Sequence, residues 1–75
     1  MELQKFINDF ALEFGDTPKS SFNASTRFKE LEEWDSVSAL SIISMVDDNY
    51  NKRISGSELR SCETIEELFE IVKNL

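Results

Sequence analysis

The chain has one side chain whose position favours covalent chemistry, a serine hydroxyl in the stretch EEWDSVSAL, residues 32–40. Asp35 and Ser36 directly precede an apolar run, and both residue types are preferred at helix N-caps. A hydroxyl at a helix start lies near free backbone N–H groups, so a phosphate attached to Ser36 would be electrostatically favoured. The chain has no His and no other base to activate this hydroxyl, so we expect another enzyme to modify Ser36.

A second set of polar residues has the spacing of a calcium-binding loop. In the stretch DDNYNKRISGSE, residues 47–58, the ligand positions of an EF-hand are filled by Asp47, Asn49, Asn51, Ile54 and Glu58. The sixth position needs Gly for a sharp turn, and here it is Lys52, a cation. A polar turn between two helices is the simpler interpretation, and a degenerate single EF-hand module is the alternative.

The composition excludes several classes of site. Without His and with Cys62 as its one Cys, the chain forms neither a His/Cys metal site nor a His-dependent catalytic triad. One Cys also rules out an internal disulfide, which fits a reducing compartment. Seventy-five residues make one small domain, 1–75, with little room for an internal catalytic cavity. We therefore expect a protein that is not itself an enzyme and that binds no metal.

Charge and hydropathy indicate the kind of partner. A net charge of −7 repels nucleic acid and anionic membranes and attracts basic patches on other proteins. The start MELQKFINDF lacks the basic and apolar regions of a signal peptide. The longest uncharged stretch, SVSALSIISMV, is too short and too rich in serine to span a bilayer. These features predict a cytoplasmic monomer.

Four helices must position these residues. Helical spacing of apolar residues predicts a helix over 3–14 that Gly15 ends, and further helices over 36–50 and 64–74. Capping boxes start a short third helix over 56–61 and the last helix; their pairs are Ser55 with Glu58 and Thr64 with Glu67. The result is an all-α fold, a small four-helix bundle with a long loop between the first two helices.

The long loop, residues 16–34, carries four apolar residues that we expect to pin it to the core: Phe22, Phe28, Leu31 and Trp34. In the helix over 36–50, one stripe predicts the core face: Ala39, Ile42, Ile43, Val46 and Tyr50. Ser41, Ser44 and Asp48 lie roughly opposite, and Val37 and Met45 flank this polar face, where they could contact a partner.

The stretch TRFKELEEWDSVSALSIISMVDDNY resembles the modification region of acyl carrier proteins. The family pattern has Phe-x-x-Leu, then Asp-Ser-Leu at the start of the second helix, then apolar residues and an acidic helix end. The matching residues are Phe28, Leu31, Asp35, Ser36, Val37, Asp47 and Asp48. The likeness extends over nearly the whole chain in element order, length and acidity.

This resemblance implies a 4′-phosphopantetheine arm on Ser36, whose terminal thiol carries an acyl group as a thioester. Asp35 would position the serine for a phosphopantetheinyl transferase that uses Mg²⁺ and coenzyme A. Further partners would be an acyl-loading ligase, acyltransferase or ketosynthase with basic docking patches. The docking residues would be Val37, Ser41, Met45, Asp47, Asp48 and Glu58. The walls of an acyl pocket would be Ile54, Leu59, Cys62, Ile65 and Leu68.

Three positions differ from the carriers of general fatty-acid synthesis. Val37 replaces the usual Leu, and Ser38 and Ser41 stand where those carriers often have acids. A second helix with few acids at its front would pair weakly with basic patches on housekeeping enzymes. We therefore expect a discrete carrier of fatty-acid, lipid or specialised acyl metabolism, and an aminoacyl or peptidyl carrier of a non-ribosomal pathway is the alternative.

Overall fold

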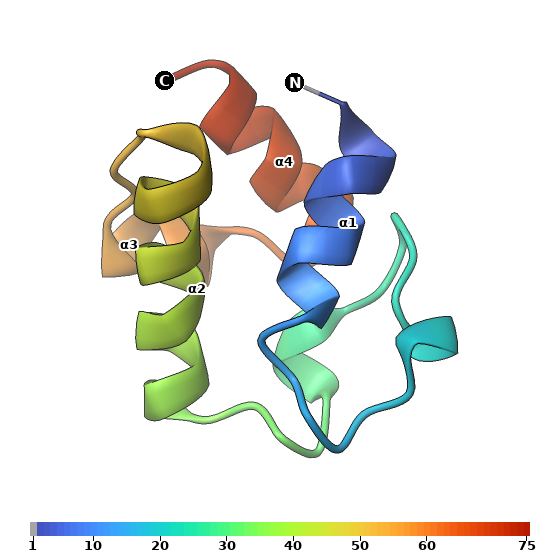
Figure 1. The fold of residues 1–75 in the computed structure, drawn as a ribbon. Coiled ribbons are helices and arrows are strands. Elements are labelled where there is room, and N and C mark those ends of the chain that lie inside the picture. Colours follow the sequence, from blue (N-terminus) through green and yellow to red (C-terminus); the bar gives the residue numbers. More distant parts are fainter. Residues whose placement is uncertain (1) are drawn as a thin grey trace.

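The computed structural model describes residues 2–75, which form four α-helices and two 3₁₀ turns without a strand (Figure 1). In chain order these are α1 (Leu3–Ala11), η1 (Lys19–Ser21), η2 (Phe28–Glu30), α2 (Ser36–Tyr50), α3 (Gly56–Ser61) and α4 (Ile65–Lys73). The predicted all-α bundle with a short third helix and a long loop between the first two helices is confirmed. None of the helices within residues 2–75 has the length and apolar character needed to cross a membrane.

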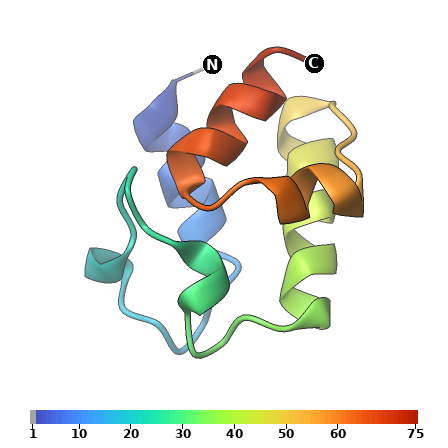
Figure 2. The same cartoon turned by 180° about the vertical axis from the view of Figure 1, so that it is seen from behind.

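The helices enclose one core. α1 runs away from the end of the molecule where both termini lie, and α2 runs back towards it (Figure 1). α1 packs on both α2 and α4, and α3 packs on α2. Figure 2 shows α3, α4 and the η2 turn (green) from behind, with η2 beside the start of α2. The loop between α1 and α2 therefore brings its second turn close to Ser36.

Aromatic side chains hold this long loop in place. Phe22 and Phe28 are buried, and their rings lie 6.2 and 5.4 Å from the ring of Phe10 on α1. Trp34 packs edge-on against Phe28 with ring centroids 5.0 Å apart. Leu31 is partly buried against the same core. The prediction that these residues pin the loop is confirmed.

Local capping sets most helix ends. The Asp35 carboxylate caps α2, and Asn51 ends this helix in the left-handed region with φ 56°. Ser55 and Glu58 form the predicted capping box of α3. The C-terminal end of α1 is the exception, because the helix stops at Ala11 and the next residues continue in tighter i→i−3 hydrogen bonds. The predicted helix over 3–14 is therefore three residues too long, although Phe14 remains buried.

The N-terminal cap of α4 is simpler than the predicted capping box. The Thr64 side chain accepts a hydrogen bond from the backbone N–H of Glu67, as expected. The Glu67 carboxylate, however, accepts from the backbone N–H of Glu63, at 2.6 Å, and not from that of Thr64. The second capping box was therefore wrong in one of its two bonds, because the chain before Thr64 offers a better-placed N–H.

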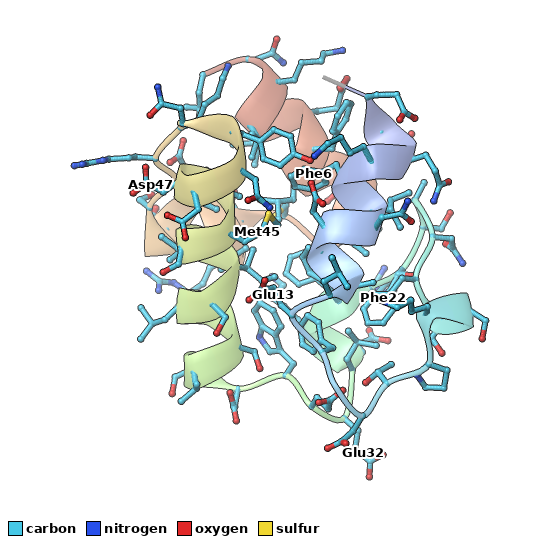
Figure 3. All side chains as sticks on the ribbon, in the orientation of Figure 1. Phe6, Glu13, Phe22, Glu32, Met45 and Asp47 are labelled. Carbon is cyan, nitrogen blue, oxygen red and sulfur yellow. The ribbon has the colours of Figure 1, made fainter. Side chains whose placement is uncertain are left out.

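The buried face of α2 differs from the predicted stripe. Ile42 and Val46 are fully buried as expected, whereas Ala39, Ile43 and Tyr50 are only partly buried. The third buried residue is Met45, which was predicted to flank the exposed polar face. That prediction was wrong, because α1 packs alongside α2 and covers the flank that carries Met45 (Figure 3). Since α3 also packs on α2, the helix is covered on two flanks.

Candidate functional site

Ser36 is the first residue of α2 and is exposed. Its neighbour Asp35 has extended backbone geometry and serves as the N-cap. Asp35 Oδ1 accepts a hydrogen bond from the backbone N–H of Ser38, with a distance of 2.8 Å. The cap therefore uses Asp35 and Ser38 and leaves the hydroxyl of Ser36 free to face solvent at the positive end of the helix dipole.

The carboxyl group of Asp35 is held in its charged form. The backbone N–H of Ser38 lowers its pKa, and the Ser38 hydroxyl, 3.1 Å from Oδ1, lowers it further. The same hydroxyl lies 2.9 Å from the carbonyl oxygen of Glu33, which orients it between the loop and the helix. At neutral pH the residue directly before Ser36 therefore carries an ionised carboxylate that is held by Ser38.

A pocket of about 370 Å³ opens beside Ser36, and we call it the Ser36 pocket. Its lining residues come from η2, the loop before α2, α2 itself and α3: Lys29, Trp34, Asp35, Ser36, Ala39, Gly56, Leu59 and Arg60. Of the predicted acyl-pocket residues, Leu59 lines it. The other four, Ile54, Cys62, Ile65 and Leu68, are buried in the core and do not line this pocket. Their role as walls of an acyl pocket stays a prediction.

Cys62 has no accessible thiol in this fold. The residue is 2% exposed, and burial raises the pKa of its thiol above the ordinary value. Its Sγ donates a hydrogen bond to the carbonyl oxygen of Leu59. Since the thiolate is the nucleophile, this side chain serves as a small core residue.

A groove on the other flank of α2 brings together part of the predicted docking surface. This α1–α2 groove, of about 320 Å³, is lined by Glu13, Val37, Leu40, Ser41, Ser44, Met45, Asp48 and Asn49. Val37, Ser41 and Asp48 of the predicted docking residues line it, and Met45 contributes from the core side. The other two docking residues do not line it: Asp47 is exposed and Glu58 is in the α3 cap.

Leu40 is the residue that the sequence analysis missed. It is 64% exposed, close to the 69% of Val37, and the two lie three residues apart on the same face of α2. That spacing from Val37, together with its position outside the apolar stripe, is the signal that could have identified it. Two exposed aliphatic side chains at the start of the groove give this face of α2 an apolar patch near Ser36.

The proposed calcium ligands at 47–58 are not arranged as a cation loop. Asp47 and Asn49 lie within α2, where they point in different directions around the helix axis. Ile54 is buried, and Glu58 Oε1 accepts from the backbone N–H of Ser55 at 2.9 Å. Across residues 2–75, no three acidic or Cys side chains converge in a way that could hold a metal ion. The structure therefore favours the polar interhelical turn.

The comparison with known families gave one match. The family model described as phosphopantetheine attachment site matches residues 4–72, which is nearly the whole chain. No curated protein and no solved structure matched the chain.

Proposed function

This chain belongs to the phosphopantetheine attachment site family, and from that premise we propose that it is an acyl carrier protein whose arm is attached at Ser36. Proteins of this family carry a covalent 4′-phosphopantetheine group and are carriers without catalytic activity of their own. When bound, this group supplies a terminal thiol that holds the cargo as a thioester. The residue that bears it, the cargo and the pathway are the subjects of the proposal.

The observation that carries the proposal is the exposed hydroxyl of Ser36 at the N-terminus of α2, in the residue that follows the ionised N-cap Asp35. The surroundings fit a phosphodiester, because free N–H groups and the helix dipole favour an anion there. The Ser36 pocket offers room for the part of the arm nearest to the serine. Asp35 fixes the helix start and so holds the backbone of Ser36 in one position for the transferase.

Two kinds of partner follow from this assignment. A phosphopantetheinyl transferase would use coenzyme A and Mg²⁺ and would itself take the proton of the Ser36 hydroxyl, since the chain has no His. An acyl-loading ligase, acyltransferase or ketosynthase would then exchange cargo with the arm. The net charge of −7 supports partners with basic surfaces around their docking sites.

The docking face that we propose is the α1–α2 groove with its apolar patch. Val37 and Leu40 are exposed. Of the two acids that line this groove, Asp48 lies about two turns further along α2, and Glu13 lies just after the end of α1. An apolar contact near Ser36 with few acids supports a carrier of a specialised acyl pathway, working in the cytoplasm, over one that serves general fatty-acid synthesis. Asp47 and Glu58 would make weaker contacts at the edge of the docked enzyme.

Intact-mass measurement tests the attachment. The apo protein is incubated with coenzyme A, Mg²⁺ and a promiscuous phosphopantetheinyl transferase. We expect the mass to rise by one phosphopantetheine in the wild type and not in Ser36→Ala. Ser44→Ala is the matched control, because Ser44 is also an exposed serine of α2 and should leave the gain unchanged. A gain that persists in Ser36→Ala, or no gain with several transferases, contradicts the proposal.

Loading assays test the cargo and the docking face. The modified protein is offered to a panel of acyl ligases and, separately, to amino-acid-activating enzymes; efficient loading only by the second group would contradict an acyl carrier. Val37→Lys should slow loading without changing the circular dichroism spectrum. Ser20→Lys, an exposed change on η1, is the control. Equal rates for both variants would exclude this docking face.

A further inference from the structure

Two basic side chains line the Ser36 pocket, in a protein where acids outnumber bases by 15 to 8. They are Lys29, from η2, and Arg60, from α3. We call this pair the basic rim. Its two residues are 31 positions apart in the chain and meet only because the loop between α1 and α2 folds back beside α3. The tertiary fold thus places two bases from distant parts of the chain at the pocket that contains Ser36.

The basic rim is held in place by neighbouring backbone. Lys29 Nζ donates a hydrogen bond to the carbonyl oxygen of Arg60, with a distance of 2.7 Å, and so ties η2 to the end of α3. The Arg60 guanidinium lies back along α3 over Gly56, where an added Cβ would stand 3.2 Å from Nη1. Gly56 therefore leaves the space that Arg60 uses beside the pocket.

Neither side chain of the basic rim is in an ion pair among the described residues. Within residues 2–75, the bases in ion pairs are Lys5, Arg27 and Lys73, so neither residue of the rim is paired in the described structure. The remaining lining of the pocket includes three apolar side chains, Trp34, Ala39 and Leu59. The pocket thus combines an apolar wall with two available positive charges, beside a hydroxyl that receives a phosphate in the proposed function.

The arm carries a charged group followed by an apolar group, and the pocket offers both positive charges and an apolar wall. The first group of the arm is a phosphodiester with one negative charge, and after one methylene comes a carbon that bears two methyl groups. At Ser36 this new charge would stand beside the Asp35 carboxylate, which repels it. Positive charges close by would offset that repulsion, and Trp34 and Leu59 would cover the methyl groups.

We propose, resting on the assignment of the arm to Ser36, that the Ser36 pocket holds the phosphate end of the arm, with Lys29 and Arg60 as counter-charges of the phosphodiester. The arm then exchanges between a docked position along the pocket and an extended position in solvent. A partner enzyme that receives the cargo must favour the extended position, so the basic rim sets how readily the arm leaves the carrier surface.

Trp34 makes this exchange measurable, because it is the one Trp of the chain and it lines the pocket. Apo and modified protein are compared by Trp fluorescence, with intact mass as the record of modification. We expect modification to shift the Trp34 emission to shorter wavelength, because the docked arm excludes water from the indole. High salt should reverse part of this shift by screening the basic rim.

Charge-removing variants assign the effect to the basic rim. Lys29→Gln with Arg60→Gln removes both charges and keeps a polar side chain. It should reduce the modification-dependent shift about twofold or more, the size expected for exposed charge pairs. The control is Lys19→Gln with Arg53→Gln, two exposed bases outside the pocket lining, and should respond as the wild type does. Equal melting temperatures would show that all variants are folded.

The outcomes separate this inference from the proposed function. No mass gain at Ser36 overturns both. A mass gain with unchanged Trp34 emission overturns only the docked arm. A shift that persists in full in the rim variant shows that other contacts hold the arm. A shift that arises only after an acyl group is loaded shows that the pocket holds the cargo. Either result overturns the role of the basic rim.

Discussion

Truncation of two side chains of α2 tests the orientation of this helix, on which the docking face depends. Met45 and Leu40 are of similar size, but Met45 is 4% exposed and Leu40 is 64% exposed. If the structure is right, Met45→Ala removes a core residue, and Leu40→Ala removes a side chain that lies mostly in solvent. The two variants are therefore matched controls for each other on one helix.

The expected magnitudes differ several-fold. Truncating a buried Met to Ala costs about 2–5 kcal/mol, and because Met45 borders a groove that can partly collapse, we expect about 2–3 kcal/mol. A 75-residue domain has a total stability of about 4–11 kcal/mol, so this loss is substantial. It corresponds to a melting temperature lower by about 8–24 °C. Leu40→Ala should change the stability by about 0.5 kcal/mol or less.

Urea unfolding followed by far-ultraviolet circular dichroism measures both values, and an unchanged m-value shows that the unfolding reaction is the same. The modification and loading assays complete the test: Leu40→Ala should slow loading by an apolar-docking partner, whereas folded Met45→Ala should still accept the arm at low temperature. If Leu40→Ala loses as much stability as Met45→Ala or more, α2 is rotated about its axis relative to this structure.

Three further predictions follow from single side chains. Asp35→Asn should keep most of the melting temperature because Asn also caps helices, whereas Asp35→Ala should lower it. Since the pKa of Asp35 is lowered in the folded state, the stability that Asp35 contributes should be present at neutral pH and lost as the pH falls through that lowered pKa. A melting temperature that does not change between acid and neutral pH would contradict this. Tyr50→Phe removes the hydrogen bond that Tyr50 Oη donates to Asp9 Oδ2 at 2.5 Å and should lower the free energy of unfolding by about 1 kcal/mol in urea titrations at neutral pH. Burial alone would raise the pKa of Asp9, but hydrogen bonds from Lys5 and Tyr50 outweigh it and lower the pKa. The difference in free energy of unfolding between Tyr50→Phe and wild type should therefore shrink in acid, as Asp9 is protonated. A difference that stays constant with pH would refute the link between Tyr50 and the Asp9 carboxylate. Cys62 in folded apo protein should react slowly with a chromogenic disulfide reagent, and modification should add one fast-reacting thiol; rapid reaction of the apo protein would contradict its burial.

The functional features that were predicted correctly depend on short-range interactions. The caps at Asp35 and Ser55 and the helix over 36–50 follow from hydrogen bonds and apolar spacing within a few residues. The family was recognisable for the same reason, because Asp35, Ser36 and the apolar run after them form one contiguous stretch. Such short patterns can be interpreted without knowing how the rest of the chain folds.

Apart from the local bond of Glu67 to the N–H of Glu63, the errors arose where distant segments meet. The extent of burial around α2 depends on two neighbours, α1 and α3, and one sequence stripe does not show that α1 also covers Met45. The α1 helix likewise ends early because its last residues turn towards the loop core, which Phe14 joins through its contacts with Phe22 and Trp34. Apolar periodicity alone carries no information on either arrangement.

The sequence by itself determined that this is a small helical carrier, and that Ser36 stands at a helix start where a phosphate is favoured, because capping and the helix dipole act over one turn. Only the tertiary structure decided what surrounds that serine. Lys29 and Trp34 reach the Ser36 pocket from the long loop and Arg60 reaches it from α3, and their meeting depends on how the long loop packs against α3. Side chains this far apart in the chain become neighbours only through the packing of the whole core.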